Sequence, residues 1–430
     1  MDMPAKKKLP IGVSSFAAIR RSNGYYVDKT QLIMRLIDST PRTSAILFTR
    51  PRRFGKTLNL DMLNCFFDCN AKEKNRPLFD GLEVSKSPRH MEEQGIYPVI
   101  FISFKDTKSA SPAAMEKDLR NALLNAYGRF DYLLQSDKLS NLDKKRLDQL
   151  LDPRANLDDF SSSLSLLCST LAKHHGQPVV LLIDEYDVPM QMAYQHNNYG
   201  PIRDFMRNFL SAGLKDNHNL RLAVITGVLR IAKDSLFSGL NNLIVDTILS
   251  KNYDDCFGFT QTDVEAMLEY YGKSEKLAEL KDWYDGYRFG ESDIYNPWSV
   301  LQYMRQDCCA DAYWLDTSSN DLSIEFLQRL EEKDRDKVWD LYRGGSVTAP
   351  IDTSVSYQQL DSCDPDVLFS LMAVTGYLKP IRELGRSRYQ LQVPNAEINT
   401  IFADEILRYL KQGKHVTGLQ EIWDALRDDE

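Results

Sequence analysis

The chain has 430 residues, a formal net charge of -8 and a hydrophobic content of 43%. This length predicts two or three domains, and the composition is ample for buried cores. The negative charge gives no whole-chain reason to expect nucleic acid, and no apolar run approaches the roughly 18 residues of a membrane span. Seven cysteines without a C-x-x-C pair and no N-terminal apolar signal region predict reduced thiols, a cytoplasmic location and no structural metal.

Apolar runs alternate with helical patterns along the first 250 residues. The runs at 99–102 and 179–183 are almost continuously apolar, as in parallel strands that are buried on both faces. Such alternation predicts a doubly wound α/β domain over residues 1–250, with a parallel sheet and helices on both faces. Strands are expected at 45–49, 97–104, 179–184 and 222–226, and helices at 58–67, 113–134, 157–173 and 201–212.

The pattern changes after about residue 250. Thr260-Gln-Thr-Asp263 can cap a helix that runs to Tyr271. Aromatic and turn residues then cluster at 283–290 and 295–299, followed by short helices. We therefore expect a mainly helical lid with an aromatic cluster over residues 251–345.

The last part of the chain has a different order of elements. A helix at 367–374 is followed by two strand-like runs at 377–382 and 388–393, and then by a helix at 398–410. Helix, hairpin and helix predict a winged-helix-like region. We expect residues 346–430 to hold this region and the start of a linker to a missing C-terminal domain.

The segment Arg50-Pro-Arg-Arg-Phe-Gly-Lys-Thr57 lies between the first predicted strand and the first predicted helix. Strand, loop ending in Gly-Lys-Thr, and helix is the layout of a phosphate-binding P-loop. Gly55 permits the tight turn, and Lys56 supplies a cation for the β- and γ-phosphates. The Thr57 hydroxyl can bind Mg²⁺, and the following helix adds the positive end of its dipole.

Arginines make this loop unusual. Arg50 stands where the motif normally begins with glycine, and Pro51 removes one backbone N–H donor. In one interpretation Arg52 and Arg53 compensate through bidentate contacts with phosphates, and in the other they face solvent. The predicted nucleotide-binding residues are Arg52, Arg53, Phe54, Gly55, Lys56, Thr57 and Leu58.

A second motif ends the predicted strand at 179–184. Asp184 at the strand end would hold Mg²⁺, and Glu185 would polarise the attacking water. Both belong at the sheet edge where the P-loop opens. The alternative is an acidic helix cap, but two motifs at strand ends in this order favour a nucleotide site.

The next predicted strand ends in Thr226, which would sense the γ-phosphate unless it is a simple strand exit. Arg230 and Lys233 follow, and an arginine here can reach phosphates in cis or from a neighbouring subunit of a homo-oligomer. A surface cation is the alternative for each. The predicted catalytic residues are Glu185, Lys56, Thr226 and Arg230, and the predicted Mg²⁺ ligands are Thr57 and Asp184.

The adenine base of a bound nucleotide needs a binding surface of its own, apart from the P-loop that holds the phosphates. Phe16 or Tyr26 can stack on adenine, because the chain before the first strand often forms the base pocket, with core packing as the alternative. The aromatic residues at 283–299 are expected to pack a small core. The alternative is that Arg288 or Asn296 approaches the nucleotide from the lid.

Several segments together resemble the AAA-ATPase-like family of bacterial and microbial-eukaryote proteins. They are Tyr25–Thr30, Arg50–Thr57, Leu181–Asp187, Thr226–Lys233, Trp283–Arg288 and Tyr295–Ser299. The resemblance spans about residues 9–320. It implies a P-loop ATPase domain of AAA or STAND-like type that uses ATP and Mg²⁺, and the Arg-Pro-Arg-Arg-Phe-Gly-Lys loop is typical of it.

Members of that family often carry a C-terminal PD-(D/E)XK-type nuclease domain. No Asp…(Asp/Glu)-x-Lys constellation follows Leu410 in this sequence. We therefore expect no nuclease activity in this chain.

These features predict an ATP-binding, ATP-hydrolysing switch in which hydrolysis reorients the lid and winged-helix region and so regulates an effector or partner. One alternative is a catalytically degenerate module that holds nucleotide and binds DNA through the winged-helix region, with Arg386 and Arg388 as contacts. Another is the regulatory half of a nuclease system, which gates a separate effector domain.

Overall fold

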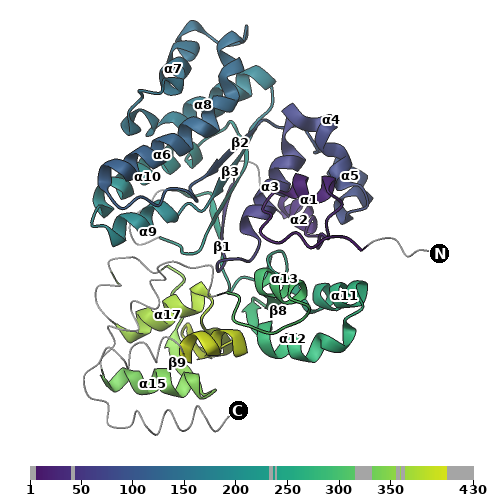
Figure 1. Cartoon of the computed structure of the whole chain (residues 1–430). Helices are drawn as coiled ribbons and strands as arrows, with labels where there is room; N and C mark the ends of the chain where they lie inside the picture. Colours follow the sequence, from purple (N-terminus) through teal and green to yellow (C-terminus); the bar gives the residue numbers. More distant parts are fainter. Residues whose placement is uncertain are drawn as a thin grey trace, which may run out of the picture.

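A computed structural model describes residues 6–39, 44–231, 236–237, 240–314, 332–354, 359 and 364–403. Figure 1 shows a sheet layer between two groups of helices, with two smaller groups of elements beneath it. Within the described part, no helix is both long enough and apolar enough to cross a membrane.

The central sheet has five parallel strands in the order β2-β3-β4-β1-β5. Every residue of β1, β3 and β4 is buried, which explains why the central residues of these strands are mostly apolar. The strands are β1 (Ser44–Thr49), β2 (Val99–Ser103), β3 (Val179–Asp184), β4 (Leu220–Gly227) and β5 (Leu243–Asp246).

Helices cover both faces of this sheet, so the predicted P-loop NTPase-type α/β fold is confirmed. Figure 1 shows α6 and α8–α10 on one side of the strands and α1–α5 on the other. The helices are α1 (Phe16–Arg21), α2 (Gln31–Ser39), α3 (Lys56–Phe67), α4 (Lys72–Asn75), α5 (Pro88–Met91), α6 (Pro112–Tyr127), α7 (Asn141–Leu151), α8 (Ser163–His175), α9 (Val188–Gln195) and α10 (Tyr199–Leu214).

A small antiparallel sheet and three helices follow the central sheet in the chain. The Thr260 hydroxyl accepts the Asp263 N–H at 3.2 Å and so caps α11 as the sequence predicted. Tyr284, Tyr295 and Tyr303 lie in a separate buried cluster here. The elements are β6 (Phe259–Thr260), α11 (Gln261–Tyr271), α12 (Leu277–Tyr284), β7 (Tyr287–Phe289), β8 (Ser292–Tyr295) and α13 (Pro297–Arg305), with sheet order β6-β8-β7.

The C-terminal elements form a three-stranded antiparallel sheet of order β10-β11-β9 with two helices. Gly376 ends α17 with a φ of +96°, and a Cβ placed on it would lie 3.1 Å from the Cβ of Pro51. The end of α17 therefore packs directly on the P-loop. The elements are α15 (Glu332–Tyr342), β9 (Val347–Pro350), α17 (Pro365–Thr375), β10 (Lys379–Gly385) and β11 (Arg388–Gln392).

Some elements differ from the sequence prediction. The helix expected at 113–134 ends at Tyr127, and residues 128–135 continue as a 3₁₀ helix with a non-helical backbone at Phe130. Strand β5 was not predicted, because it is short, lies at the sheet edge and leaves Ile244 40% exposed. The helix expected at 398–410 begins at residue 396, and its end lies outside the described residues.

Candidate functional site

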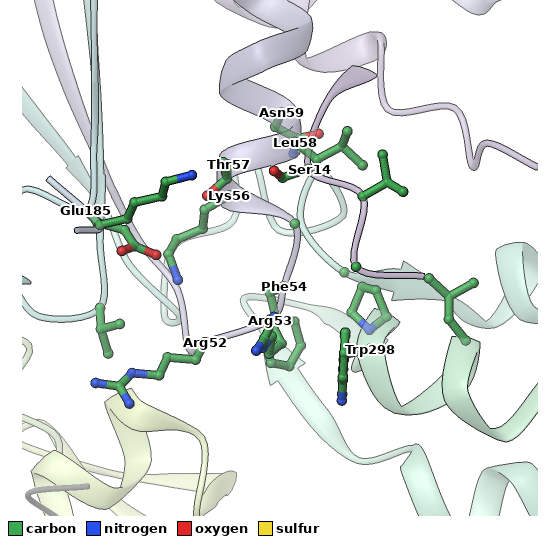
Figure 2. A pocket seen from close by; sticks show the side chains of 18 of the residues that line it. Ser14, Arg52, Arg53, Phe54, Lys56, Thr57, Leu58, Asn59, Glu185 and Trp298 are labelled. Carbon is green, nitrogen blue, oxygen red and sulfur yellow. The ribbon is translucent and has the colours of Figure 1, made fainter. Parts of the chain in front are cut away.

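A cavity of about 680 Å³ opens at the carboxyl ends of the central strands. Its walls come from the P-loop (residues 50–57), the end of β3, the turn after β2, the N-terminal segment and α13. Figure 2 shows the P-loop side chains between Glu185 on one side and Trp298 on the other. The predicted site residues that line it are Arg52, Arg53, Phe54, Gly55, Lys56, Thr57, Leu58 and Glu185.

Lys56 is folded back onto its own loop. Gly55 has a φ of +81° immediately before α3, so the chain turns into the helix without a clash at Cβ. The Lys56 ammonium is buried and donates to the carbonyl oxygens of Arg50 at 3.0 Å and Pro51 at 2.8 Å. Burial lowers the pKa of Lys56, and nearby carboxylates led by Glu185 oppose that shift. The cation thus lies where a phosphate can replace the two carbonyls.

Asp184, at the end of β3, is bonded to the end of β4 and to the first turn of α3. One of its carboxylate oxygens accepts the Thr57 hydroxyl at 2.8 Å, and the other accepts the Thr226 hydroxyl at 2.7 Å. Asp184 and Thr226 are fully buried. Carboxylate and hydroxyl oxygens are the donors that Mg²⁺ prefers, so this set of residues fits the predicted ion.

Glu185 has an unusual backbone. Its φ is +52°, a left-handed conformation that costs about 1–3 kcal/mol in a non-glycine residue and is frequent at functional sites. The following residue, Tyr186, donates its N–H to the Thr226 carbonyl at 3.0 Å and helps to hold this turn. Burial, followed by the charge of Asp184, raises the pKa of the Glu185 carboxyl. A carboxylate with a perturbed pKa in a cleft is a candidate general base.

Sequence reasoning missed a clamp that follows Glu185. The Tyr186 hydroxyl donates to the Leu229 carbonyl at 2.6 Å and accepts the Ile231 N–H at 3.0 Å. The buried carboxylate of Asp187 accepts the N–H groups of Val228 at 2.8 Å and Leu229 at 2.9 Å. These four bonds fix the loop after β4 to the end of β3. The acidic run Asp-Glu-Tyr-Asp at 184–187 was the only sequence signal for them.

The hydrogen bonds made by Tyr186 and Asp187 also fix the loop that carries Arg230. A Cβ on Gly227 would lie 2.7 Å from a carboxylate oxygen of Asp187, so the loop needs glycine there. Arg230 follows on this fixed loop but is not among the residues that line the cavity. Lys233 lies outside the described residues. The structure therefore brings Thr226 to Asp184 through a hydrogen bond, and neither of these two residues nor Arg230 lines the cavity.

Arg50 has a structural role that the sequence left open. Its side chain is 0% exposed and forms an ion pair with Asp246 at 2.5 Å. The guanidinium carbon lies 5.2 Å from the ring centroid of Phe257 and 5.1 Å from that of Phe289. Arg50 thus anchors the P-loop to β5 and to the small sheet, and it points away from the cavity that Lys56 lines.

Arg52 and Arg53 have different surroundings from Arg50. Arg53 has a φ of +70°, and its guanidinium carbon lies 4.4 Å from the centroid of the Trp298 ring. Arg52 donates to the side-chain oxygen of Gln191 at 3.3 Å. It also lines a second, small cavity with Leu371 and Thr375 of α17. Both cations border the main cavity, and Arg53 is also exposed.

The aromatic residues that the sequence offered as adenine neighbours divide between the core and the cavity. Phe16 is fully buried and packs on Tyr26 with ring centroids 5.2 Å apart, so it belongs to the core. Tyr26 lines the cavity. Arg288 is exposed, Asn296 is buried as the cap of α13, and neither lines the cavity. The apolar residues that do so include Pro10, Val13, Val27, Phe259, Met267, Pro297, Trp298 and Leu301.

The sheet, the loop between β1 and α3, and the carboxylates after β3 define the class of nucleotide-binding P-loop ATPases. The chain belongs to the family described as Predicted AAA-ATPase, whose sequence model matches residues 10–237. It is 30% identical over 426 residues to an uncharacterized protein in the vnfD 5′ region of Azotobacter chroococcum mcd 1, covering 95% of this chain and 72% of that protein.

One solved structure shares a loose likeness. It is the Drosophila ORC bound to AT-rich DNA and Cdc6, with 10% identity and a TM-score of 0.23 over 91% of this chain and 93% of that chain. Such a low overlap has no bearing on the function of this chain.

Proposed function

We propose that this chain binds ATP with Mg²⁺ and hydrolyses it to ADP and phosphate. The observation that carries this proposal is the junction at Asp184, which accepts the hydroxyls of Thr57 and Thr226 at 2.8 and 2.7 Å. This junction adjoins a cavity whose wall contains Lys56 and Glu185. Hydroxyl, carboxylate, cation and candidate base therefore meet at one sheet edge.

The charges of the cavity suit a polyphosphate. Lys29, also at the wall, is neutralised by Asp263 at 2.7 Å. The remaining lysines and arginines outnumber the carboxylates that line the cavity, so the wall attracts a triphosphate. These cations are Arg52, Arg53, Lys56, Lys105 and Lys108, and the carboxylates are Glu185, Asp187 and Asp106.

Each residue near the phosphates has a role that follows from its place. Lys56 would exchange the Arg50 and Pro51 carbonyls for β- and γ-phosphate oxygens, and the amides at the start of α3 would bind the phosphates. Thr57 and Asp184 would hold Mg²⁺, which neutralises phosphate charge and polarises the γ-phosphoryl group. Glu185 would accept a proton from the attacking water.

The base would lie against Trp298. This ring borders the cavity beside Pro297, Leu301 and Val13, and one of its faces carries Arg53. Aromatic and apolar surfaces bind a purine by stacking. We assign the base-binding wall to this group, with Tyr26 at its inner end.

Turnover by wild type and by two variants tests the proposal. Lys56→Ala removes the phosphate cation and should weaken ATP binding, whereas Glu185→Gln should keep binding and lose hydrolysis. Phosphate release and fluorescent-nucleotide titration separate the two effects. If both variants hydrolyse ATP at the wild-type rate, the assignment is wrong.

We further propose that the nucleotide sets the position of the C-terminal elements. The end of α17 packs on Pro51, and Arg52 lies between the main cavity and the α17 residues Leu371 and Thr375. A triphosphate that draws Arg52 inward would move its side chain away from the small cavity that it shares with α17. Spin labels on α6 and β10 should report different distances with ADP and with ATP bound to Glu185→Gln; equal distances would contradict a switch.

A DNA-binding module is the second candidate. The order α15, β9, α17, β10, β11 with sheet order β10-β11-β9 supports a winged-helix-like region. Arg386 lies at the exposed tip of the β10–β11 hairpin with a φ of +51°, whereas Arg388 donates to the Thr348 carbonyl at 2.9 Å. Salt-dependent DNA binding that weakens in Arg386→Ala would favour this candidate. Regulation of a nuclease partner is a further proposal.

A further inference from the structure

The turn after β2 is fixed beside the proposed catalytic carboxylates. Strand β2 pairs with β3 so that Ser103 lies opposite Asp184, and the Phe104 N–H donates to the Asp184 carbonyl at 3.0 Å. The Thr107 hydroxyl donates to the Phe104 carbonyl at 2.7 Å. The Lys108 N–H donates to the Asp106 carbonyl at 3.0 Å. Residues 104–108 are therefore an ordered turn on the Glu185 side of the cavity.

Lys108 is a cation at this wall whose side chain has no protein partner in the described part of the chain. It is exposed and lines the cavity, and among the residues that the structure describes its ammonium forms no hydrogen bond or ion pair. Of the other three lysines that line the cavity, Lys29 pairs with Asp263 and Lys56 bonds to its own loop, whereas Lys105 is exposed like Lys108.

Phosphoryl transfer needs such a cation. In hydrolysis the water oxygen attacks the γ-phosphorus, its proton passes to Glu185, and the bond to the bridging oxygen breaks with its electron pair staying on ADP. A cation at the terminal phosphate stabilises the developing charge and is worth about 10³–10⁵ in rate when an arginine supplies it. Arg230 does not line the cavity, since Tyr186 and Asp187 hold its loop at the end of β3.

We propose that Lys108 supplies the positive charge at the terminal phosphate from within the same chain, so that hydrolysis needs no arginine from a second copy. This inference rests on the proposed ATPase function and names one more catalytic residue for it. Lys108 forms no covalent bond and transfers no proton. Lys105, on the same turn, is a second cation at the rim of the cavity.

The test compares a nucleotide with a γ-phosphate to one without it. Lys108→Ala should weaken binding of ATPγS at least about fivefold and leave the affinity for ADP unchanged, because only ATPγS reaches the lysine. Its kcat for ATP should fall at least about tenfold, and Lys108→Arg should recover part of the loss. Lys117→Ala is the matched control, since Lys117 is also exposed, follows on α6 and does not line the cavity.

Two results would overturn the inference. One is a Lys108→Ala variant with wild-type kcat and wild-type ATPγS affinity. The other is a turnover number per chain that rises with protein concentration and disappears in Arg230→Ala, which would indicate a cation from a neighbour. Wild type in the same titrations tests the proposed function separately. If wild type binds both nucleotides without turnover, the contrast between ATPγS and ADP still decides the role of Lys108.

Discussion

The two halves of the cavity are built in different ways. The phosphate half comes from short motifs at the ends of β1, β3 and β4, and its polar groups already bond to one another, as Thr57, Asp184 and Thr226 do. The base half comes from the N-terminal segment and α13, which lie far apart in the sequence, and its surface is mainly apolar. In the proposed assignment, the first half would select the phosphates by charge and geometry, and the second would hold the base by stacking. Perturbing the two halves should therefore have different consequences.

The largest effect is expected on hydrolysis in the phosphate half. Replacing Glu185 by Gln removes the proposed proton acceptor and should lower kcat about 10²–10⁴-fold while ATP binding persists. Phosphate release under single-turnover conditions measures this loss. Glu116→Gln, at an exposed position on α6, serves as the control. If the variant loses both ATP binding and hydrolysis, Glu185 instead has a structural role in the site.

Arg50 tests whether the whole P-loop belongs to the phosphate half. Arg50→Ala leaves the Asp246 carboxylate buried without its partner, which should lower the free energy of unfolding by about 3–5 kcal/mol. Replacing Arg50 by Met and Asp246 by Leu together should recover much of that stability. Urea unfolding measures both. A stable Arg50→Ala variant with impaired ATP binding would show that this arginine serves the nucleotide.

Glu397 tests the support of the base half. It lies after β11 and is 0% exposed. Its carboxylate accepts hydrogen bonds from the Ser299 hydroxyl of α13 at 2.9 Å and from the backbone N–H of Trp314 at 2.9 Å. Burial raises the pKa of the Glu397 carboxyl to about 7. Because the folded-state pKa lies above the unfolded value, the stability linked to this group is present at low pH and is lost as the pH rises through about 7.

The neutral variant Glu397→Gln should not lose that stability. Its free energy of unfolding should exceed that of wild type at pH 8.5 by an amount on the order of 2–3 kcal/mol, and the difference should shrink progressively toward pH 4.5. Unfolding in urea across this pH range measures the difference. A constant difference at every pH would mean that Glu397 does not titrate in the folded chain.

Trp298 should give the smallest effect. Trp298→Ala removes the proposed stacking surface and should weaken ATP and ADP equally, by about 1 kcal/mol or roughly fivefold in Kd. Trp283→Ala is the control, because Trp283 packs at the edge of the separate aromatic cluster and does not line the cavity. If only the affinity for ATP falls, Trp298 lies near the γ-phosphate, and the division into a phosphate half and a base half is wrong.

The two halves also differ in how well the sequence predicts them. The ends of β1 and β3 could be located from apolar runs followed by Lys56 and Asp184, because sequence neighbours make that half. The base half depends on contacts between residues far apart in the sequence, such as the Arg53–Trp298 stack across 298 − 53 = 245 residues, which no local pattern specifies. Arg50 shows the same limit, since its partner Asp246 lies on a short edge strand that the sequence did not indicate.

The order of strands in the sheet has a consequence for synthesis on the ribosome. Strand β1 pairs with β4 and β5 in the central sheet, and both are made long after it. Until residues 220–246 have left the ribosome, the nascent chain has an apolar strand without neighbours and a P-loop without its anchor at Asp246. Nucleotide therefore cannot assist the early folding of this chain, and any factor that prevents premature aggregation must act before the site exists.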